Sequence, residues 1–271
     1  MIALGRLTVE SPEVVEVLAV RLLGRDADGA MVEVLEANAA RSVDFATPTL
    51  PFLARVPGSS RATTWEGFPI VRNGDGLPPS VEPGLSEPSV DDQGNLFVTA
   101  FLDNFGVEPL WARATGVVAQ DGRWLAADLV EVPVPLAPNQ GAAVTLLIPR
   151  PSLESGSTPA DLEWMIFTDG MPAEETALPL TTEVVAYEPV GSRLILRVRV
   201  QAPGAEGVRT AAVSAVVRHE TGPVASAAWA SVADLDPGES AIVVLALPLP
   251  AGFDLTTSVV DVWGGGLPAS P

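Results

Sequence analysis

The chain has 271 residues, of which 47% are hydrophobic and 18% are charged, a composition that excludes a mainly disordered protein and has room for two or three domains. Its 34 acidic and 15 basic residues leave a net charge of -19, which disfavours binding to nucleic acid and to anionic membrane surfaces. Cysteine is absent, so disulfides, thiolate metal sites and cysteine nucleophiles are excluded.

The first 20 residues do not look like a secretion signal. They contain one arginine and are interrupted by Glu10, Glu13 and Glu16 before a long apolar run develops. No stretch elsewhere approaches the roughly 20 apolar residues that a membrane span needs. We therefore expect a soluble protein without direct membrane insertion, cytoplasmic by default. A position on the periphery of a membrane complex and an extracellular position after processing are the alternatives.

Residues 14–38 allow two interpretations. They are the one stretch that suggests a helix, but Asp26-Ala-Asp-Gly29 in the middle is typical of a hairpin turn, which favours two strands. The stretch from Glu13 to Asn38 is also similar to the LysM-like phage tail protein X, whose helices end in Leu-Glu-Ala-Asn. That resemblance implies helix where the turn predicts strands.

A pattern of turn residues repeats three times along the chain. Apolar segments end in a turn glycine at Gly29, Gly122 and Gly222, and these glycines lie 93 and 100 residues apart. A first proline follows these glycines by 28, 27 and 26 residues, at Pro57, Pro149 and Pro248. A second proline follows them by 49, 50 and 46 residues, at Pro78, Pro172 and Pro268. The repeat length is that of one immunoglobulin-like domain.

Each repeat is expected to be β. Charged and apolar residues alternate in Leu194–Val200, the pattern of a strand with one solvated face, and 26 prolines and 24 glycines leave few places for long helices. We predict an all-β protein of three tandem immunoglobulin-like β-sandwich domains at 1–82, 83–180 and 181–271, the first being the most divergent. The proline-containing stretches 77–89 and 172–182 are predicted linkers that make the chain a semi-rigid rod.

The second and third repeats carry motifs of a known kind of module. Ala215–Gly222 reads as a strand that runs into a turn, and Leu235-Asp-Pro-Gly-Glu-Ser-Ala241 precedes the apolar run 242–247, with a weaker counterpart at Leu136–Ala142. These segments resemble the small bacterial immunoglobulin-like modules of the FxLYD and CARDB kind. The Leu-Tyr-Asp core is missing, and the first repeat matches only in spacing. The resemblance implies a sandwich fold with an adhesive or spacing role.

Residues for covalent catalysis are scarce. His219 is the single histidine and stands beside Glu220 before a turn glycine, every basic residue is arginine, and Tyr187 is the single tyrosine. Carboxylates are abundant, but they fall in turns or alternate with apolar strand positions, which disfavours a paired-carboxylate hydrolase. We expect no enzymatic activity and no cofactor.

Two groups of residues are candidates for binding. Loop oxygens that suit calcium are weak metal candidates, at Asp26, Asp28, Asp91, Asp92 and Asn95, although none completes a known ligand pattern. Of the six tryptophans, most are expected in sandwich cores, and Trp111 and Trp124 are the candidate interface anchors.

The sequence thus predicts a non-enzymatic scaffolding protein. We expect an acidic rod that docks by sandwich faces and edge strands as an extrinsic accessory subunit of a larger assembly, which is a membrane protein complex, a cell surface or a virion. Its partners would be proteins. A carbohydrate- or calcium-binding adhesion module is the alternative.

Overall fold

The protein is all-β, as the sequence predicts. The computed structural model describes residues 2–8, 15–39, 49–73, 81–151, 161–220 and 222–269. These residues form strands that pair antiparallel in several sheets, together with a 3-10 helix at Leu255–Thr257. No helix within these ranges is long and apolar enough to cross a membrane.

The first unit, as we call β1–β5, forms one sheet in the order β1-β4-β3-β2-β5. Its strands are β1 (Ile2–Thr8), β2 (Val15–Arg25), β3 (Met31–Ala39), β4 (Thr49–Arg55) and β5 (Thr64–Asn73). The turn between β2 and β3 is stabilised by the Asp26 carboxylate, which accepts hydrogen bonds from the backbone N–H groups of Asp28 and Ala30, and Gly29 has a positive φ of 82°. The hairpin prediction for residues 14–38 is therefore confirmed, and the helix implied by the tail protein X resemblance is wrong.

The second unit comprises β6–β12 and forms two sheets, β11-β8-β6, to which β7 adds, and β10-β9-β12. Its strands are β6 (Val81–Leu85), β7 (Ser89–Val90), β8 (Leu96–Asn104), β9 (Leu110–Gln120), β10 (Arg123–Glu131), β11 (Gly141–Ile148) and β12 (Glu163–Pro172). The predicted linker 77–89 therefore contains β6, which pairs with β8, and the predicted boundary between 82 and 83 falls inside this strand.

The third unit comprises β13–β19 and forms the sheets β14-β15-β18 and β13-β19-β16-β17. Its strands are β13 (Leu178–Pro179), β14 (Thr181–Val190), β15 (Arg193–Gln201), β16 (Val208–His219), β17 (Val224–Leu235), β18 (Ser240–Pro248) and β19 (Ser258–Pro268). The second predicted linker, 172–182, contributes β13, which pairs with β19.

The same pairing order recurs in the three units. We call β1–β4, β6–β8–β11 and β14–β15–β18 the A layers, and β3–β2–β5, β10–β9–β12 and β17–β16–β19 the B layers. In the first unit the two layers are joined, because β3 also pairs with β4 at Asn38↔Leu53 and Ala39↔Phe52. The turn glycines Gly29, Gly122 and Gly222 each follow the central strand of a B layer. The division into three domains at the predicted boundaries stays a prediction.

Each unit has apolar side chains between its A and B layers. The alternation of apolar and polar residues along the strands directs one set inward, as in β15, where Leu194, Leu196 and Val198 are buried and Arg197 is exposed. The buried sets centre on Val20, Leu22 and Leu50 in the first unit, on Val98, Leu102, Leu136 and Leu146 in the second, and on Leu196, Val213, Leu245 and Leu247 in the third.

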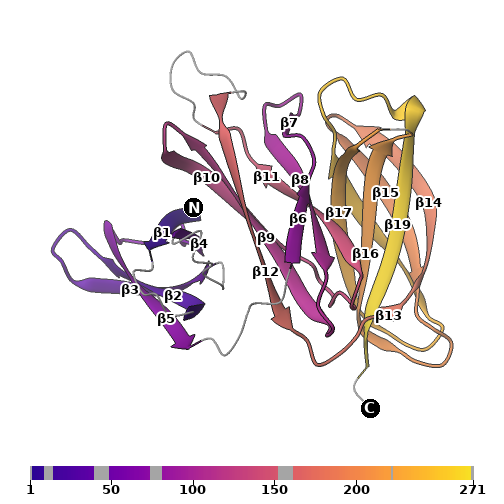
Figure 1. Ribbon diagram of the computed structural model, residues 1–271, viewed down its shortest axis with the longest axis horizontal. Helices are drawn as coiled ribbons and strands as arrows, with labels where there is room; N and C mark the ends of the chain where they lie inside the picture. Colours follow the sequence, from indigo (N-terminus) through magenta and orange to yellow (C-terminus); the bar gives the residue numbers. More distant parts are fainter. Residues whose placement is uncertain are drawn as a thin grey trace.

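The units stack by their sheet faces (Figure 1). The A layer of the first unit lies against the B layer of the second, where Arg6 contacts Trp124, and the A layer of the second lies against the B layer of the third, where Thr145 contacts Ala227. The layers thus follow one another as B, A, B, A, B, A. The units are thus in direct contact through their sheet faces, besides being joined by the stretches that the sequence predicted as linkers.

Candidate functional site

The contact between the second and third units shows how an A layer binds a B layer. The Thr145 hydroxyl of β11 accepts a hydrogen bond from the backbone N–H of Ala227 at 2.7 Å, and the Trp229 indole Nε1 donates to the Ala143 carbonyl at 2.8 Å. Trp229 also packs edge-on against Trp263, with ring centroids 5.6 Å apart. Small side chains and one large aromatic group therefore let the two sheets approach closely.

The contact between the first and second units is built on an arginine. The Arg6 guanidinium of β1 lies 4.4 Å from the centroid of the Trp124 ring and donates a hydrogen bond to the Gly122 carbonyl at 2.7 Å. Phe167 of β12 packs against the core of the first unit and lies 6.4 Å from Trp124. A cavity of about 640 Å³ borders Arg6 and Trp124 at this contact.

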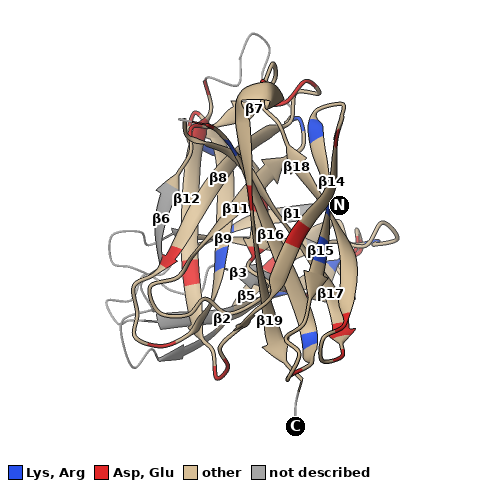
Figure 2. Ribbon diagram, turned by 90° about the vertical axis from the view of Figure 1, so that its right-hand side faces the viewer, with Lys and Arg blue, Asp and Glu red and all other residues tan. Residues whose placement is uncertain are grey.

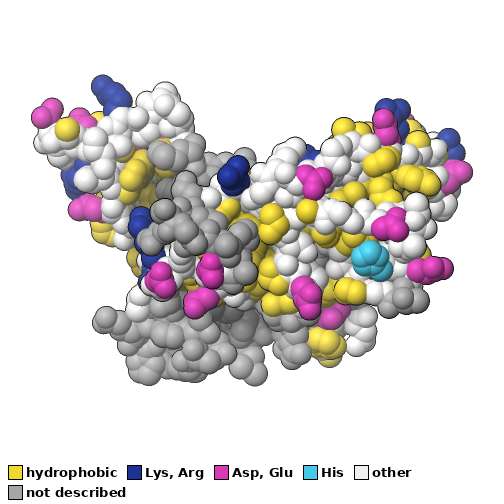
Figure 3. Space-filling view, turned by 90° about the horizontal axis from the view of Figure 1, so that it is seen from above, with side chains coloured by type: hydrophobic (Ala, Val, Ile, Leu, Met, Phe, Trp, Pro, Cys, Tyr) yellow, Lys and Arg dark blue, Asp and Glu magenta, His cyan; other side chains and the backbone are white. Residues whose placement is uncertain are grey.

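The outward A layer of the third unit is a large uncovered face (Figure 2). All but one of the residues of β14 are exposed, and the outward positions of β15 and β18 carry arginines and branched apolar side chains. The exposed apolar residues on these strands are Val184, Val185, Tyr187, Val190, Ile242 and Val244. Figure 3 shows hydrophobic side chains at the surface of this end of the molecule.

The outward B layer of the first unit is the second uncovered face. Its exposed apolar residues are Met31, Val34 and Phe68, with Phe68 50% exposed. The ion pairs Arg21–Glu36 and Arg25–Glu66 lie across its strands. Both ends of the stack thus present a sheet layer with large apolar side chains exposed to solvent.

The two tryptophans predicted as interface anchors lie at contacts within the chain. Trp124 is at the contact with the first unit, under Arg6. Trp111 packs against the apolar cluster of Val134, Ala212 and Leu267, which joins the second and third units. Neither is among the exposed large apolar residues. Docking by sandwich faces was predicted, but the exposed residues of the end layers were not singled out from the sequence.

The calcium candidates lie in two separate turns and serve the turns themselves. Asp26 caps the β2–β3 turn, and the Asp91 carboxylate accepts hydrogen bonds from the backbone N–H groups of Gln93 and Asn95. Burial works to raise the pKa of Asp91, but these hydrogen bonds and that of the Asn95 side chain outweigh it and lower the pKa. Within the described ranges no group of three acidic or histidine side chains is placed to hold a metal ion.

An ionic row crosses the B layer of the second unit. Arg113 on β9 faces Asp169 on β12 and Glu131 on β10, with Nε 2.6 Å from an Asp169 oxygen and Nη1 3.7 Å from a Glu131 oxygen. The Arg113 and Asp169 side chains are 7% and 5% exposed, beside a cavity of about 440 Å³ that Trp111 and Met171 also line. The guanidinium thus has a carboxylate counter-ion on each of the two neighbouring strands.

His219 takes part in local packing. Its ring stacks at 4.5 Å on Phe253 in a tilted arrangement, and the neighbouring Glu220 N–H bonds to the Thr257 carbonyl. Figure 3 shows this histidine in cyan at the surface. Its contacts are those of a half-buried residue at the end of β16.

Comparison with known proteins adds no family to this description. Neither the protein-family models nor the curated proteins searched contain a match to the chain. The resemblance to FxLYD and CARDB modules therefore stays a prediction.

Proposed function

We propose that the chain is a non-enzymatic structural subunit that docks into a larger assembly through the uncovered faces at the two ends of its stack. One observation carries the proposal. Of the twelve large apolar residues that are exposed within the described ranges, nine lie on strands of the two end layers. Exposed apolar side chains concentrated on the two end layers are expected of a subunit with neighbours on both sides.

The chemistry of the chain supports a role without catalysis. Cysteine and lysine are absent from the sequence, and the buried ionic groups Arg113 and Asp169 neutralise each other. The remaining acidic surface keeps the protein soluble and steers it away from other anionic molecules. The membrane complex, the cell surface and the virion are equally compatible hosts.

The test is the state of the protein in its native cells. A tagged chain from these cells should elute from gel filtration well ahead of the position of the monomer. Chemical cross-linking should join it to its neighbours through strands of the end layers. Val244→Glu, at a position 55% exposed on β18, should release it, whereas Phe105→Glu, at a position 59% exposed in a loop of the second unit, should not. A native chain that elutes as a free monomer would refute the proposal.

A further inference from the structure

The internal contacts leave one layer of each kind without a partner. Twice along the chain, an A layer packs on the B layer of the next unit, at Arg6–Trp124 and at Thr145–Ala227. The last A layer, β14–β15–β18, and the first B layer, β3–β2–β5, are the uncovered members of this series. We propose that the last A layer binds the first B layer of a second copy of the chain, head to tail. This inference rests on the proposed structural role and names the neighbour.

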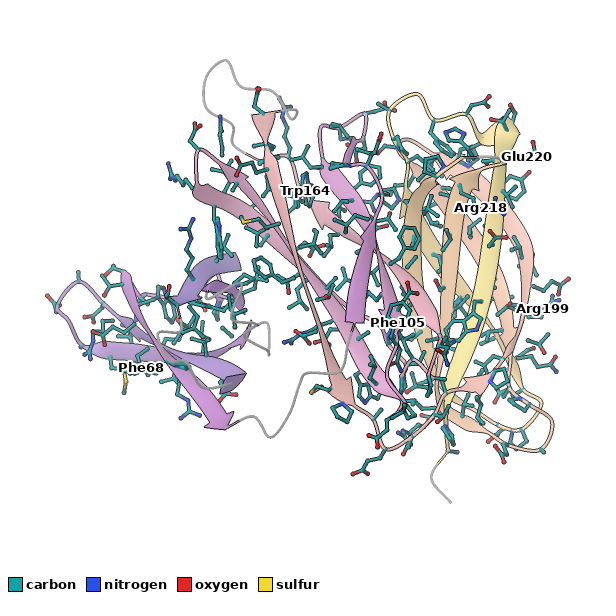
Figure 4. The ribbon with its side chains drawn as sticks, in the orientation of Figure 1. Phe68, Phe105, Trp164, Arg199, Arg218 and Glu220 are labelled. Atoms are coloured by element: carbon teal, nitrogen blue, oxygen red, sulfur yellow. The ribbon has the colours of Figure 1, made fainter. Side chains whose placement is uncertain are left out.

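The two faces are chemically suited to each other. The A face offers Ile242 and Val244, and the B face offers Val34 and Phe68, all exposed by half or more. Figure 4 shows Phe68 and Arg199 at opposite ends of the molecule, so one copy can present both faces at once to two neighbours. Burying these side chains against each other removes apolar area from water on both copies.

Arginines on the A face can contact an aromatic ring of the B face, as Arg6 contacts Trp124 inside the chain. Arg193 and Arg197 are exposed on β15, and their side chains make no hydrogen bond or ion pair with the described residues. The first internal contact sets an A-layer arginine over a B-layer aromatic ring, and Phe68 is an exposed aromatic ring on the uncovered B layer. Glu36 and Glu66 on the same B face are exposed and can accept further hydrogen bonds.

Local charge also allows the two faces to meet. Three arginines, Arg193, Arg197 and Arg199, stand against Glu183 and Glu188 on the A face, and two ion pairs balance the charge of the B face. The chain as a whole carries a charge of -19, which opposes association at low ionic strength. Salt of about 0.15 M, where the Debye length is about 8 Å, screens the distant acidic groups and leaves the face contact intact.

The contact is small, which sets the expected affinity. Three strands of nine or ten residues span roughly 30 by 14 Å, or about 400 Å² in projection, which is below the about 800 Å² per partner of a stable complex. Inside the chain a contact of this size is supported by the covalent connection, which supplies a high effective concentration. Between copies we expect reversible association at micromolar or higher concentration.

The test uses the purified full-length chain in sedimentation velocity from about 1 µM to about 1 mM, the range of weak to moderate affinities. The average mass should rise with concentration beyond a dimer, because a head-to-tail dimer still has one free A face and one free B face. Phe68→Glu blocks the B face and Val244→Glu blocks the A face, so each variant alone should stay monomeric. Mixed together, the two should form a one-to-one dimer through their intact faces. Phe105→Glu should associate like the unmodified chain.

Three results would overturn the inference. The chain could stay monomeric throughout, Phe68→Glu could still dimerise alone through two A faces, or the mixture could fail to pair although circular dichroism shows both variants folded. A monomeric purified chain that is nevertheless part of a complex in native cells would reject the head-to-tail contact and leave the structural role standing.

Discussion

Trp229 tests whether the stacking of units stabilises the protein. It is more than half buried, and Trp229→Ala removes its Nε1 hydrogen bond to Ala143 and its edge contact with Trp263. Burial of over half of an indole's roughly 200 Å² is worth about 3 kcal/mol, and the hydrogen bond adds about 1 kcal/mol. We expect a loss of about 3–4 kcal/mol in the free energy of unfolding. Urea unfolding followed by circular dichroism measures it.

Two further variants separate the packing from the hydrogen bond. Trp229→Phe keeps most of the aromatic contact and loses the hydrogen bond, so its loss should be about 1–2 kcal/mol. Phe105→Ala truncates an exposed aromatic residue and should change stability by less than about 0.5 kcal/mol. If Trp229→Ala behaves like Phe105→Ala, the contact between the second and third units does not stabilise the fold, and the stacking argument is wrong.

Two further predictions concern ionised side chains in the second unit. Burial raises the pKa of Asp128 although the Leu147 N–H donates a hydrogen bond to its carboxylate, so the charged form opposes folding above the raised pKa. Relative to Asp128→Asn, the wild-type chain should therefore gain stability as the pH falls from about 7 toward 4. A difference in thermal stability between the two chains that does not change with pH would contradict this. Arg113→Met removes the guanidinium that neutralises the buried carboxylate of Asp169 and should lower the free energy of unfolding by about 3–5 kcal/mol in urea. The double variant Arg113→Met with Asp169→Leu should lose less. A larger loss in the double variant would show that the unpaired carboxylate is not the cause of the destabilisation.

The strands could be predicted from the sequence because their signal is local. Arg197 and Arg199 alternate with buried apolar residues in β15, and the Asp26–Gly29 turn specifies a hairpin whatever surrounds it. The turn glycines Gly29, Gly122 and Gly222 marked the end of a strand for the same reason. The A-on-B stacking was not predicted, because it joins residues about 80 positions apart, such as Thr145 and Ala227, that share no local pattern.

One sequence signal did distinguish the covered layers from the uncovered ones. In β9, Ala112–Ala119 lacks charged residues apart from Arg113, and every residue of this stretch is buried, which is the composition of a strand covered on both faces. β16 has the same character in Ala211–Val217, whereas β15 places three arginines on one face. Strands with a charged face belong to the end of the stack, and strands without one belong to its interior.

The proposed docking uses sheet faces and not the edge strands that the sequence also suggested, and the build of several edges supports this choice. Proline stands within the edge strands β5, β6 and β14, at Pro69, Pro83 and Pro189, and removes a backbone N–H that a new strand would need. At the β10–β11 margin of the second unit the Asp128 carboxylate accepts the Leu147 N–H, so that donor is also unavailable. With these edges blocked and apolar side chains exposed on the end layers, association of this chain is expected to extend the stack along its layer direction and not to widen its sheets.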